Sequence, residues 1–207
     1  MKNHVITLSR ELGSGGNLVA QELSKRLDIP YYDKEIINKT AEEFGLPKDQ
    51  LQKNDEKKTN SFLYSLATAR LAGLSSPSFP INDILLDDRS FMFTSETIKR
   101  LAVDPCIIVG RCADYVLENR KIIKVFVCAD LEDRVRRISE SLELSEKNAM
   151  KLIQKTDKRR AAYYNSYTDR QWGKASNYHI TINTSVLGID KSVDVLQKFI
   201  ESYNENK

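Results

Sequence analysis

The chain has 207 residues, 41% of them hydrophobic, so it is long enough to form one domain spanning 1–207 around a real core. Its 32 Lys and Arg nearly balance its 29 Asp and Glu, and the net charge of +3 gives no general attraction to nucleic acid or membranes. No apolar run approaches the roughly 20 residues of a membrane span, and Met1 to Ser9 lacks the apolar stretch of a signal peptide. We therefore expect a cytoplasmic protein whose partners are neither membranes nor nucleic acids.

Short apolar, β-branched runs alternate along the chain with segments of helical periodicity. The predicted strands cover 5–8, 30–33, 106–109, 122–127 and 179–183. The predicted helices cover 17–27, 34–44, 62–74, 81–101, 130–141, 145–164 and 190–202, and 46–60 reads as a loop. The predicted N-caps of four helices are Asn17, Asp33, Asp130 and Ser145. Because the central strands are continuously apolar, we predict an α/β fold in which helices cover both faces of a parallel sheet.

Ligands of such sheets bind outside the carboxyl ends of the strands. The first strand runs directly into a glycine-rich segment that precedes a helix, and its backbone amides are candidates for an anion site. The predicted phosphate-binding residues are Gly13, Ser14, Gly15, Gly16 and Asn17. The alternative is an ordinary glycine-rich turn.

The loop departs from the pattern GxxxxGK[ST] of many nucleotide-binding loops. Aligned on Gly15, the lysine position holds Gly16 and the hydroxyl position holds Asn17, so the usual direct contacts to phosphate and magnesium are missing. We predict that Arg10, in the same loop, supplies the missing cation, since its guanidinium suits phosphate. The alternative is that Arg10 is a surface charge.

Further arginines lie where the ligand is expected. Arg111 follows the apolar strand 106–109, so it either grips a phosphate or forms a structural ion pair. The helix 130–141 carries Arg134, Arg136 and Arg137, and one or two of them are expected to face the crevice while the others are solvated.

A long basic helix follows. It carries four cations spaced four residues apart, which repel one another unless an anion offsets them: Lys147, Lys151, Lys155 and Arg159. Arg160 extends this charge, and we predict that 144–172 forms a helical lid over a transferring phosphoryl group. A solvated face and a nucleic-acid surface are the alternatives. The aromatic residues nearby are expected to pack together: Tyr163, Tyr164, Tyr167 and Trp172.

Four segments together resemble the cytidylate kinase-like family, which is similar to enzymes with the P-loop nucleoside monophosphate kinase fold. They are Leu8-Ser-Arg-Glu-Leu-Gly-Ser-Gly-Gly16, Pro30-Tyr-Tyr-Asp-Lys-Glu35, Ile107-Ile-Val-Gly-Arg111 and Asn177-Tyr-His-Ile-Thr-Ile-Asn-Thr-Ser185. The resemblance implies transfer of the γ-phosphoryl group of ATP to CMP or dCMP with Mg²⁺. With two histidines and three scattered cysteines, the sequence suggests no set of metal ligands.

The resemblance also implies roles for matched positions. Asp33 would help to place the acceptor or a magnesium-bound water, and Arg111 would hold the acceptor phosphate. Asp157 and Arg159 would belong to the lid and acceptor-recognition region, together with Arg160, Arg137 and Arg134. The segment 46–80, which departs from the family pattern, would be an insertion on the acceptor side.

The leading hypothesis is an ATP-dependent phosphotransferase that acts on a nucleoside monophosphate or another small phosphorylated substrate. Arg10, Asp33, Arg111 and Arg159 would carry catalysis. The second hypothesis is a nucleotide-binding sensor or regulatory protein that has lost phosphoryl transfer, which the missing lysine favours. A nucleic-acid-binding protein that uses the basic helix is the third.

Overall fold

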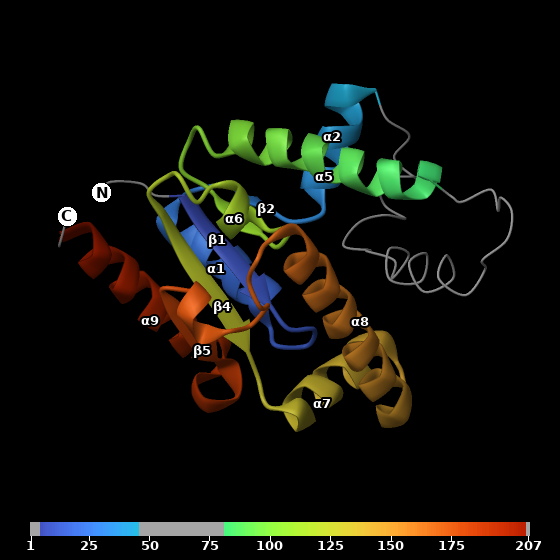
Figure 1. Ribbon diagram of the computed structural model, residues 1–207. Helices are drawn as coiled ribbons and strands as arrows, with labels where there is room; N and C mark the ends of the chain where they lie inside the picture. The colour runs from blue at the N-terminus through green and yellow to red at the C-terminus, as the bar shows by residue number, and fades with distance from the viewer. Residues whose placement is uncertain (1–4, 46–80, 206–207) are drawn as a thin grey trace, which may run out of the picture.

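A computed structural model describes residues 5–45 and 81–205 (Figure 1). Its centre is a five-stranded sheet in the order β2-β3-β1-β4-β5, and each neighbouring pair is parallel. The strands are β1 (Val5–Arg10), β2 (Tyr31–Tyr32), β3 (Ile107–Val109), β4 (Ile122–Cys128) and β5 (Ile180–Asn183). The prediction of a parallel sheet is confirmed, and all carboxyl ends meet at one edge.

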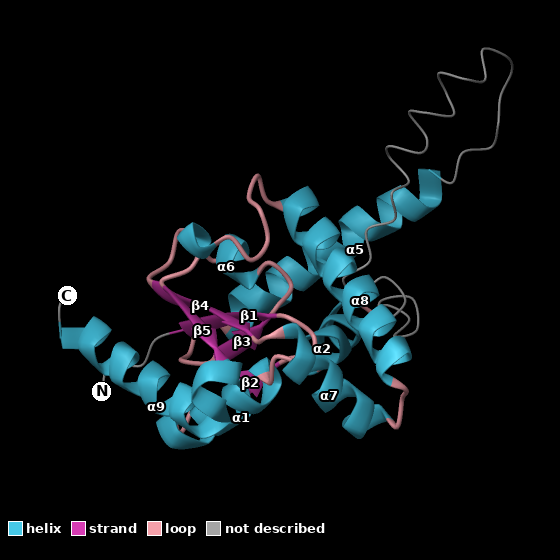
Figure 2. Ribbon diagram, turned by 90° about the horizontal axis from the view of Figure 1, so that it is seen from below, coloured by secondary structure: helices cyan, strands magenta, loops and turns pink. Residues whose placement is uncertain are grey.

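Helices cover both faces of the sheet, as predicted (Figure 2). Helices α1 and α9 pack against each other on one face, whereas α2, α5 and α6 cover the other. Helices α7 and α8 form an antiparallel pair beyond the carboxyl ends of the strands (Figure 1). The helices are α1 (Gly16–Leu27), α2 (Glu35–Phe44), α5 (Ile81–Leu101), α6 (Ala113–Val116), α7 (Leu131–Leu142), α8 (Glu146–Tyr167) and α9 (Thr184–Glu205).

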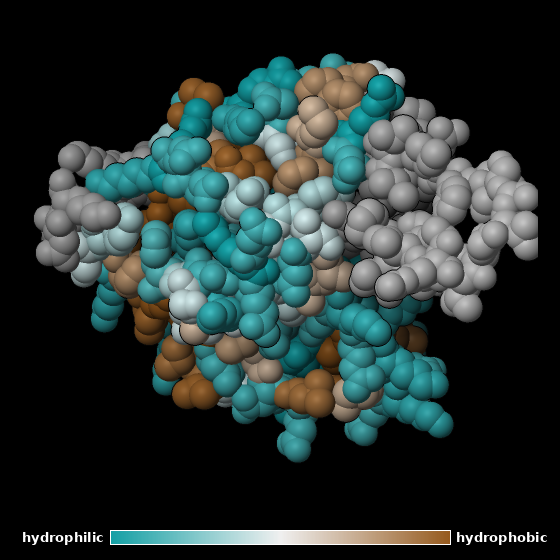
Figure 3. Space-filling model, in the orientation of Figure 1, coloured by the Kyte–Doolittle hydropathy of each residue, from teal (hydrophilic) through white to brown (hydrophobic). Residues whose placement is uncertain are grey.

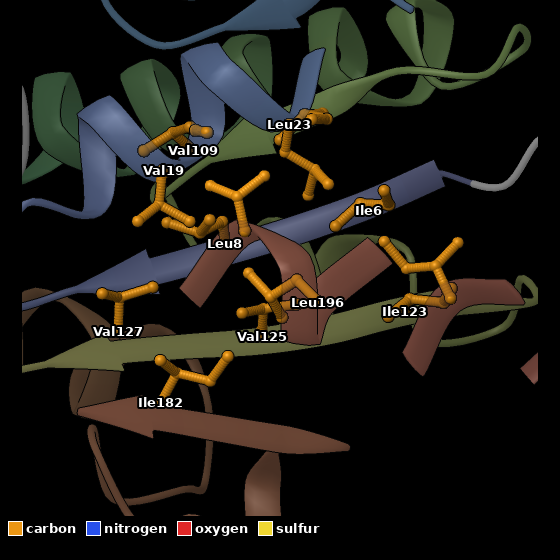
Figure 4. Packing of buried hydrophobic residues seen from close by; sticks show 14 of the residues in the cluster. Ile6, Leu8, Val19, Leu23, Val109, Ile123, Val125, Val127, Ile182 and Leu196 are labelled. Atoms are coloured by element: carbon orange, nitrogen blue, oxygen red, sulfur yellow. The ribbon is translucent and has the colours of Figure 1, made fainter. Parts of the chain in front are cut away.

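The core follows from the alternation of side chains along β1. Ile6 and Leu8 point toward α1, where Val19 and Leu23 are fully buried against them (Figure 4). On the other face of the sheet, Ile108 belongs to a second cluster with α5 and α6. Burying each aliphatic side chain of this size contributes about 1.5–3 kcal/mol, so burial on both faces stabilises the packing of the helices on the sheet.

Most predicted elements are confirmed to within a few residues, and two short ones, α6 and the 3₁₀ helix Ala175–Asn177, were not predicted. The last helix begins at Thr184 instead of Asp190, but it is interrupted at Gly188, whose φ is 73° and ψ is 172°. The predicted loop 46–60, helix 62–74 and insertion 46–80 lie outside the described residues.

Two of the four N-cap predictions are wrong. The N-cap of α1 is Gly15, which has a left-handed φ of 77°, and that of α2 is Lys34. The side chains of Asn17 and Asp33 bind each other instead, because buried arginines nearby draw the carboxylate inward. Ser145 does cap α8 by accepting a hydrogen bond from the amide of Asn148.

Asp130 is the N-cap residue of α7, as predicted, but its side chain makes no capping hydrogen bond. The carboxylate accepts a hydrogen bond from Nδ2 of Asn183 at 2.9 Å instead, which joins the start of α7 to the end of β5. Within the described ranges, no helix is both long and apolar enough to span a membrane.

Candidate active site

The glycine-rich loop forms a tight turn between β1 and α1. The amide and the Oγ atom of Ser14 both donate to the carbonyl oxygen of Glu11, at 3.3 and 2.8 Å, and the amide of Gly16 donates to Ser14 Oγ at 3.3 Å. Gly13 has a left-handed φ of 79°, and a β-carbon there would lie 2.8 Å from the carbonyl oxygen of Arg134. The turn therefore requires glycine both for its conformation and for its close approach to α7.

A cavity of about 590 Å³ opens between this loop and α7, and we call it the loop cavity. It is lined by Arg10, Glu11, Leu12, Gly13, Gly15, Gly16, Asn17, Leu18, Arg137, Ile138, Glu140, Ser141 and Arg160. The first amides of a helix have no partner within the helix, and the helix dipole adds partial positive charge there. The N-terminus of α1 and three arginines thus surround a space suited to an anion.

Arg10 is not a surface charge, because only 8% of it is exposed. Its Nη2 atom lies 3.1 Å from Oδ1 of Asp33, while Oδ2 of the same carboxylate accepts from Nδ2 of Asn17 at 2.9 Å. Arg111 donates from Nη1 to the backbone oxygen of Asp33 at 2.6 Å and lies 3.6 Å from Oδ1. Asp33, itself 4% exposed, is thus a buried anion that holds two arginines in place.

A second, much smaller cavity lies at the carboxyl ends of β1 and β3, and we call it the strand-end cavity. It is lined by Ser9, Arg10, Gly110, Arg111, Cys112, Arg160, Tyr163, Tyr164 and Trp172. Gly110, Arg111 and Cys112 have left-handed φ values of 78°, 54° and 56°. This conformation costs non-glycine residues roughly 1–2 kcal/mol each, and such strain is concentrated at functional sites.

Helix α8 brings Arg160 to both cavities. Its Nη1 atom donates to the backbone oxygen of Arg10 at 3.0 Å, and the side chain lines the loop cavity and the strand-end cavity.

Arg159, which the sequence suggested as catalytic, is exposed. Two cations of the same helix, Lys147 and Lys151, are also exposed, and hydrophilic residues predominate on the visible surface around α7 and α8 (Figure 3). Most of the basic run is therefore a solvated face.

Arg134 and Asp157 hold the backbone of the loop. The Nε atom of Arg134 donates to the carbonyl oxygen of Leu12 at 2.7 Å, and Oδ1 of Asp157 accepts from the amide of Leu12 at 2.9 Å. The two side chains also form an ion pair with each other, and Arg134 lies 3.3 Å from Oε2 of Glu11. Burial raises the pKa of the Glu11 carboxyl, and the charge of Arg134 opposes that rise. Arg134, on α7, thus binds both the loop and a residue of α8. Because only 6% of it is exposed, its side chain is not accessible to a phosphoryl acceptor.

The predicted aromatic cluster is confirmed: Tyr163 and Tyr164 are buried beside Cys112, and Tyr167 and Trp172 pack around them. Sequence reasoning missed Asp114, whose carboxylate accepts a hydrogen bond from the hydroxyl of Tyr164 at 2.7 Å. Burial raises the pKa of the Asp114 carboxyl. The signal that could have found it is its position four residues after Gly110, just beyond the carboxyl end of a predicted strand.

This parallel sheet, its strand order and a glycine-rich loop between β1 and α1 define the P-loop kinase fold. A shikimate kinase from Bacteroides thetaiotaomicron has a similar fold, with a TM-score of 0.54 and 17% identity over 96% of this chain and 98% of that one. An uncharacterized protein from Eubacterium ventriosum is more similar, with a TM-score of 0.71 and 26% identity over 97% and 99% of the two chains.

The family is shown by the sequence match. The model of the cytidylate kinase-like family matches residues 5–186, and the chain belongs to that family. A cytidylate kinase from Staphylothermus marinus is 25% identical over 206 residues, which cover 96% of this chain and 97% of the relative. The resemblance noted in the sequence is therefore confirmed.

Proposed function

We propose that the protein is an ATP-dependent phosphotransferase that acts on a nucleoside monophosphate. The observation that carries the proposal is that the loop cavity and the strand-end cavity share Arg10 and Arg160. Two cations between an anion-binding loop and a second basic cavity are placed to neutralise charge on a phosphoryl group that passes between them. The similarity to a cytidylate kinase makes CMP and dCMP the first acceptors to test. A cytoplasmic location would supply ATP.

In the proposed reaction, the loop amides and the N-terminus of α1 would bind the ATP phosphates in the loop cavity. Arg111 would bind the acceptor phosphate beside the strand-end cavity, which has a volume of about 20 Å³ and would have to widen to admit it. An oxygen of that phosphate would attack the γ-phosphorus of ATP while the bond to the bridging oxygen of ADP breaks, so no covalent enzyme intermediate forms. Asp33 would position Arg10 and Arg111, and Arg160 would lie against the transferring group.

The donor groups of the loop cavity fit a metal that arrives on the nucleotide, not a metal held by the protein alone. Among residues 5–45 and 81–205, no group of three or more His, Cys, Asp or Glu is arranged to hold a metal ion. Glu11 and Glu140 are carboxylates that line the loop cavity, and Mg²⁺ in kinases is usually held by one or two carboxylates together with phosphate oxygens. The ion would neutralise phosphate charge.

A coupled assay of ADP release with ATP, Mg²⁺ and a panel of nucleoside monophosphates tests the proposal. Arg160→Met should lower kcat by about 10²–10³-fold, since it removes a preorganised cation from the developing charge. Arg159→Met is the matched control: the neighbouring side chain is exposed, and the variant should keep nearly full activity. No turnover above background with any acceptor would contradict the proposal, and a larger loss in Arg159→Met would restore the catalytic role that the sequence suggested for Arg159.

A second candidate is a nucleotide-binding regulatory protein without phosphoryl transfer. It is favoured by Gly16, which occupies the lysine position: a β-carbon there would lie 2.5 Å from Cβ of Arg10, so the lysine has no room. This candidate predicts tight ATP binding with no turnover. A calorimetric titration with ATP beside the assay distinguishes the two functions.

A further inference from the structure

The carbonyl oxygens of the glycine-rich loop are bound one after another by side chains from outside the loop. Arg134 donates to the oxygen of Leu12, Arg137 donates from Nη1 to that of Gly13 at 3.2 Å, and Thr184 donates from Oγ1 to that of Ser14 at 2.6 Å. Thr184 is the first residue of α9, and it follows directly on β5.

These bonds also fix the direction of the loop amides. The C=O and N–H groups of one trans peptide point in opposite directions, and the described residues contain no cis peptide. Holding the oxygen of Leu12 therefore turns the N–H of Gly13 away from Arg134. Holding the oxygen of Ser14 turns the N–H of Gly15 away from Thr184. Gly13 and Gly15 both line the loop cavity.

The hydrogen-bond direction at Thr184 is determined by its neighbours. Its Oγ1 atom lies 3.0 Å from Nη1 of Arg137, which has hydrogens to donate but no lone pair to accept. The hydroxyl must therefore accept from Arg137 and give its own hydrogen to the oxygen of Ser14. Thr184 is 1% exposed, so water does not replace either bond.

We propose that Thr184 is a positioning residue of the phosphate-binding loop: it fixes the Ser14–Gly15 peptide so that the amide of Gly15 faces the bound anion. This inference rests on the proposed function, because it assumes that the loop binds phosphate. Amides that are held in advance need no reorganisation when the anion binds. A loop without the usual lysine depends more strongly on such preorganisation.

The experiment compares Thr184→Val, which keeps the shape and removes the hydroxyl, with Thr184→Ser, which keeps the hydroxyl. Thr184→Val removes the hydrogen bond donated to Ser14 and also the one accepted from Arg137. Loss of the neutral bond to Ser14 corresponds to about 0.5–1.5 kcal/mol, so Thr184→Val should weaken ATP binding by at least about 2- to 13-fold in calorimetric titration. Thr184→Ser should restore binding to within about 2-fold of the natural chain. Ser192→Ala is the matched control, because Ser192 is another buried hydroxyl of α9 and donates to Gly188.

A second readout needs no nucleotide. The amide NMR resonance of Gly15 should shift in Thr184→Val and stay in place in Ser192→Ala. Circular dichroism at the titration temperature identifies variants that are folded. An unmoved Gly15 resonance, or equal weakening of ATP binding by Thr184→Val and Ser192→Ala, overturns the inference. If the natural chain binds no ATP while the Gly15 resonance moves as expected, the proposed function fails and the positioning of the peptide by Thr184 is supported.

Discussion

The close contact between Gly16 and Arg10 predicts an unusual response to a single added methyl group. Gly16 is the first residue of α1, and replacing glycine by alanine in a helix normally stabilises a protein by up to about 1 kcal/mol. Here the new β-carbon would lie 2.5 Å from Cβ of Arg10, which is fixed by the backbone of β1 and cannot rotate away. Overpacking of this kind costs about 1–3 kcal/mol. Gly16→Ala should therefore lower the free energy of unfolding by about 1–2 kcal/mol.

Two further backgrounds isolate the contact. Arg10→Ala and Arg10→Gly both remove the guanidinium and its ion pair with Asp33, but only Arg10→Gly removes the β-carbon. Gly16→Ala should remain destabilising in the Arg10→Ala background and become neutral or stabilising in the Arg10→Gly background. Urea unfolding followed by the fluorescence of Trp172, the single tryptophan, measures the effect of Gly16→Ala in all three backgrounds at an unchanged m-value. The same penalty in both backgrounds, or a gain in stability from Gly16→Ala alone, would refute the explanation.

Three other predictions concern stability. Asp33→Asn leaves Arg10 and Arg111 without their buried counter-charge and should cost about 3–5 kcal/mol in urea unfolding; a loss below about 1 kcal/mol would contradict the role of Asp33. Burial raises the pKa of Asp114 above its ordinary value of 3.8, so the native state holds this proton more tightly, and stability should fall as pH rises from 3.8 through the raised value. Asp114→Asn should remove this loss of stability with rising pH. If the stability of the variant follows the same pH profile as that of the natural chain, Asp114 is not its source. Glu143→Gly should stabilise the protein by about 1 kcal/mol, because Glu143 is exposed and ends α7 with a left-handed φ of 52°, which glycine adopts without strain. The measurement is a higher midpoint of urea unfolding, and an unchanged or lower midpoint would contradict the strain argument.

The sheet and the position of the loop could be predicted because they depend on local patterns. A run of β-branched residues specifies a strand, and glycines between a strand and a helix specify a turn in which amides converge. The partners of the loop could not be predicted, since they are far away in sequence. Asp157, Arg134 and Thr184 bind the loop backbone across 145, 122 and 170 residues. A single sequence contains no signal for such pairs.

Two side chains of the site lie differently from what local sequence reasoning suggested, and each has a simple physical reason. Asp33 was expected to cap a helix from local preference, but the arginines at the ends of β1 and β3 hold its carboxylate in the interior. Arg159 and Arg160 are adjacent, and successive residues of a helix differ by about 100° in direction. Only the packing of α8 on the loop shows that Arg160 faces the cavities.

If both cavities bind phosphate groups as proposed, the two arginines common to them would couple the affinity of one cavity to the occupancy of the other. A dianion bound on one side draws on the same positive charge that attracts a dianion on the other side. By thermodynamic reciprocity, the factor by which the first ligand changes the affinity for the second is the factor by which the second changes the affinity for the first. The dissociation constant of either ligand would then depend on whether the other is bound, and a titration with one ligand alone would measure only one edge of a four-state cycle.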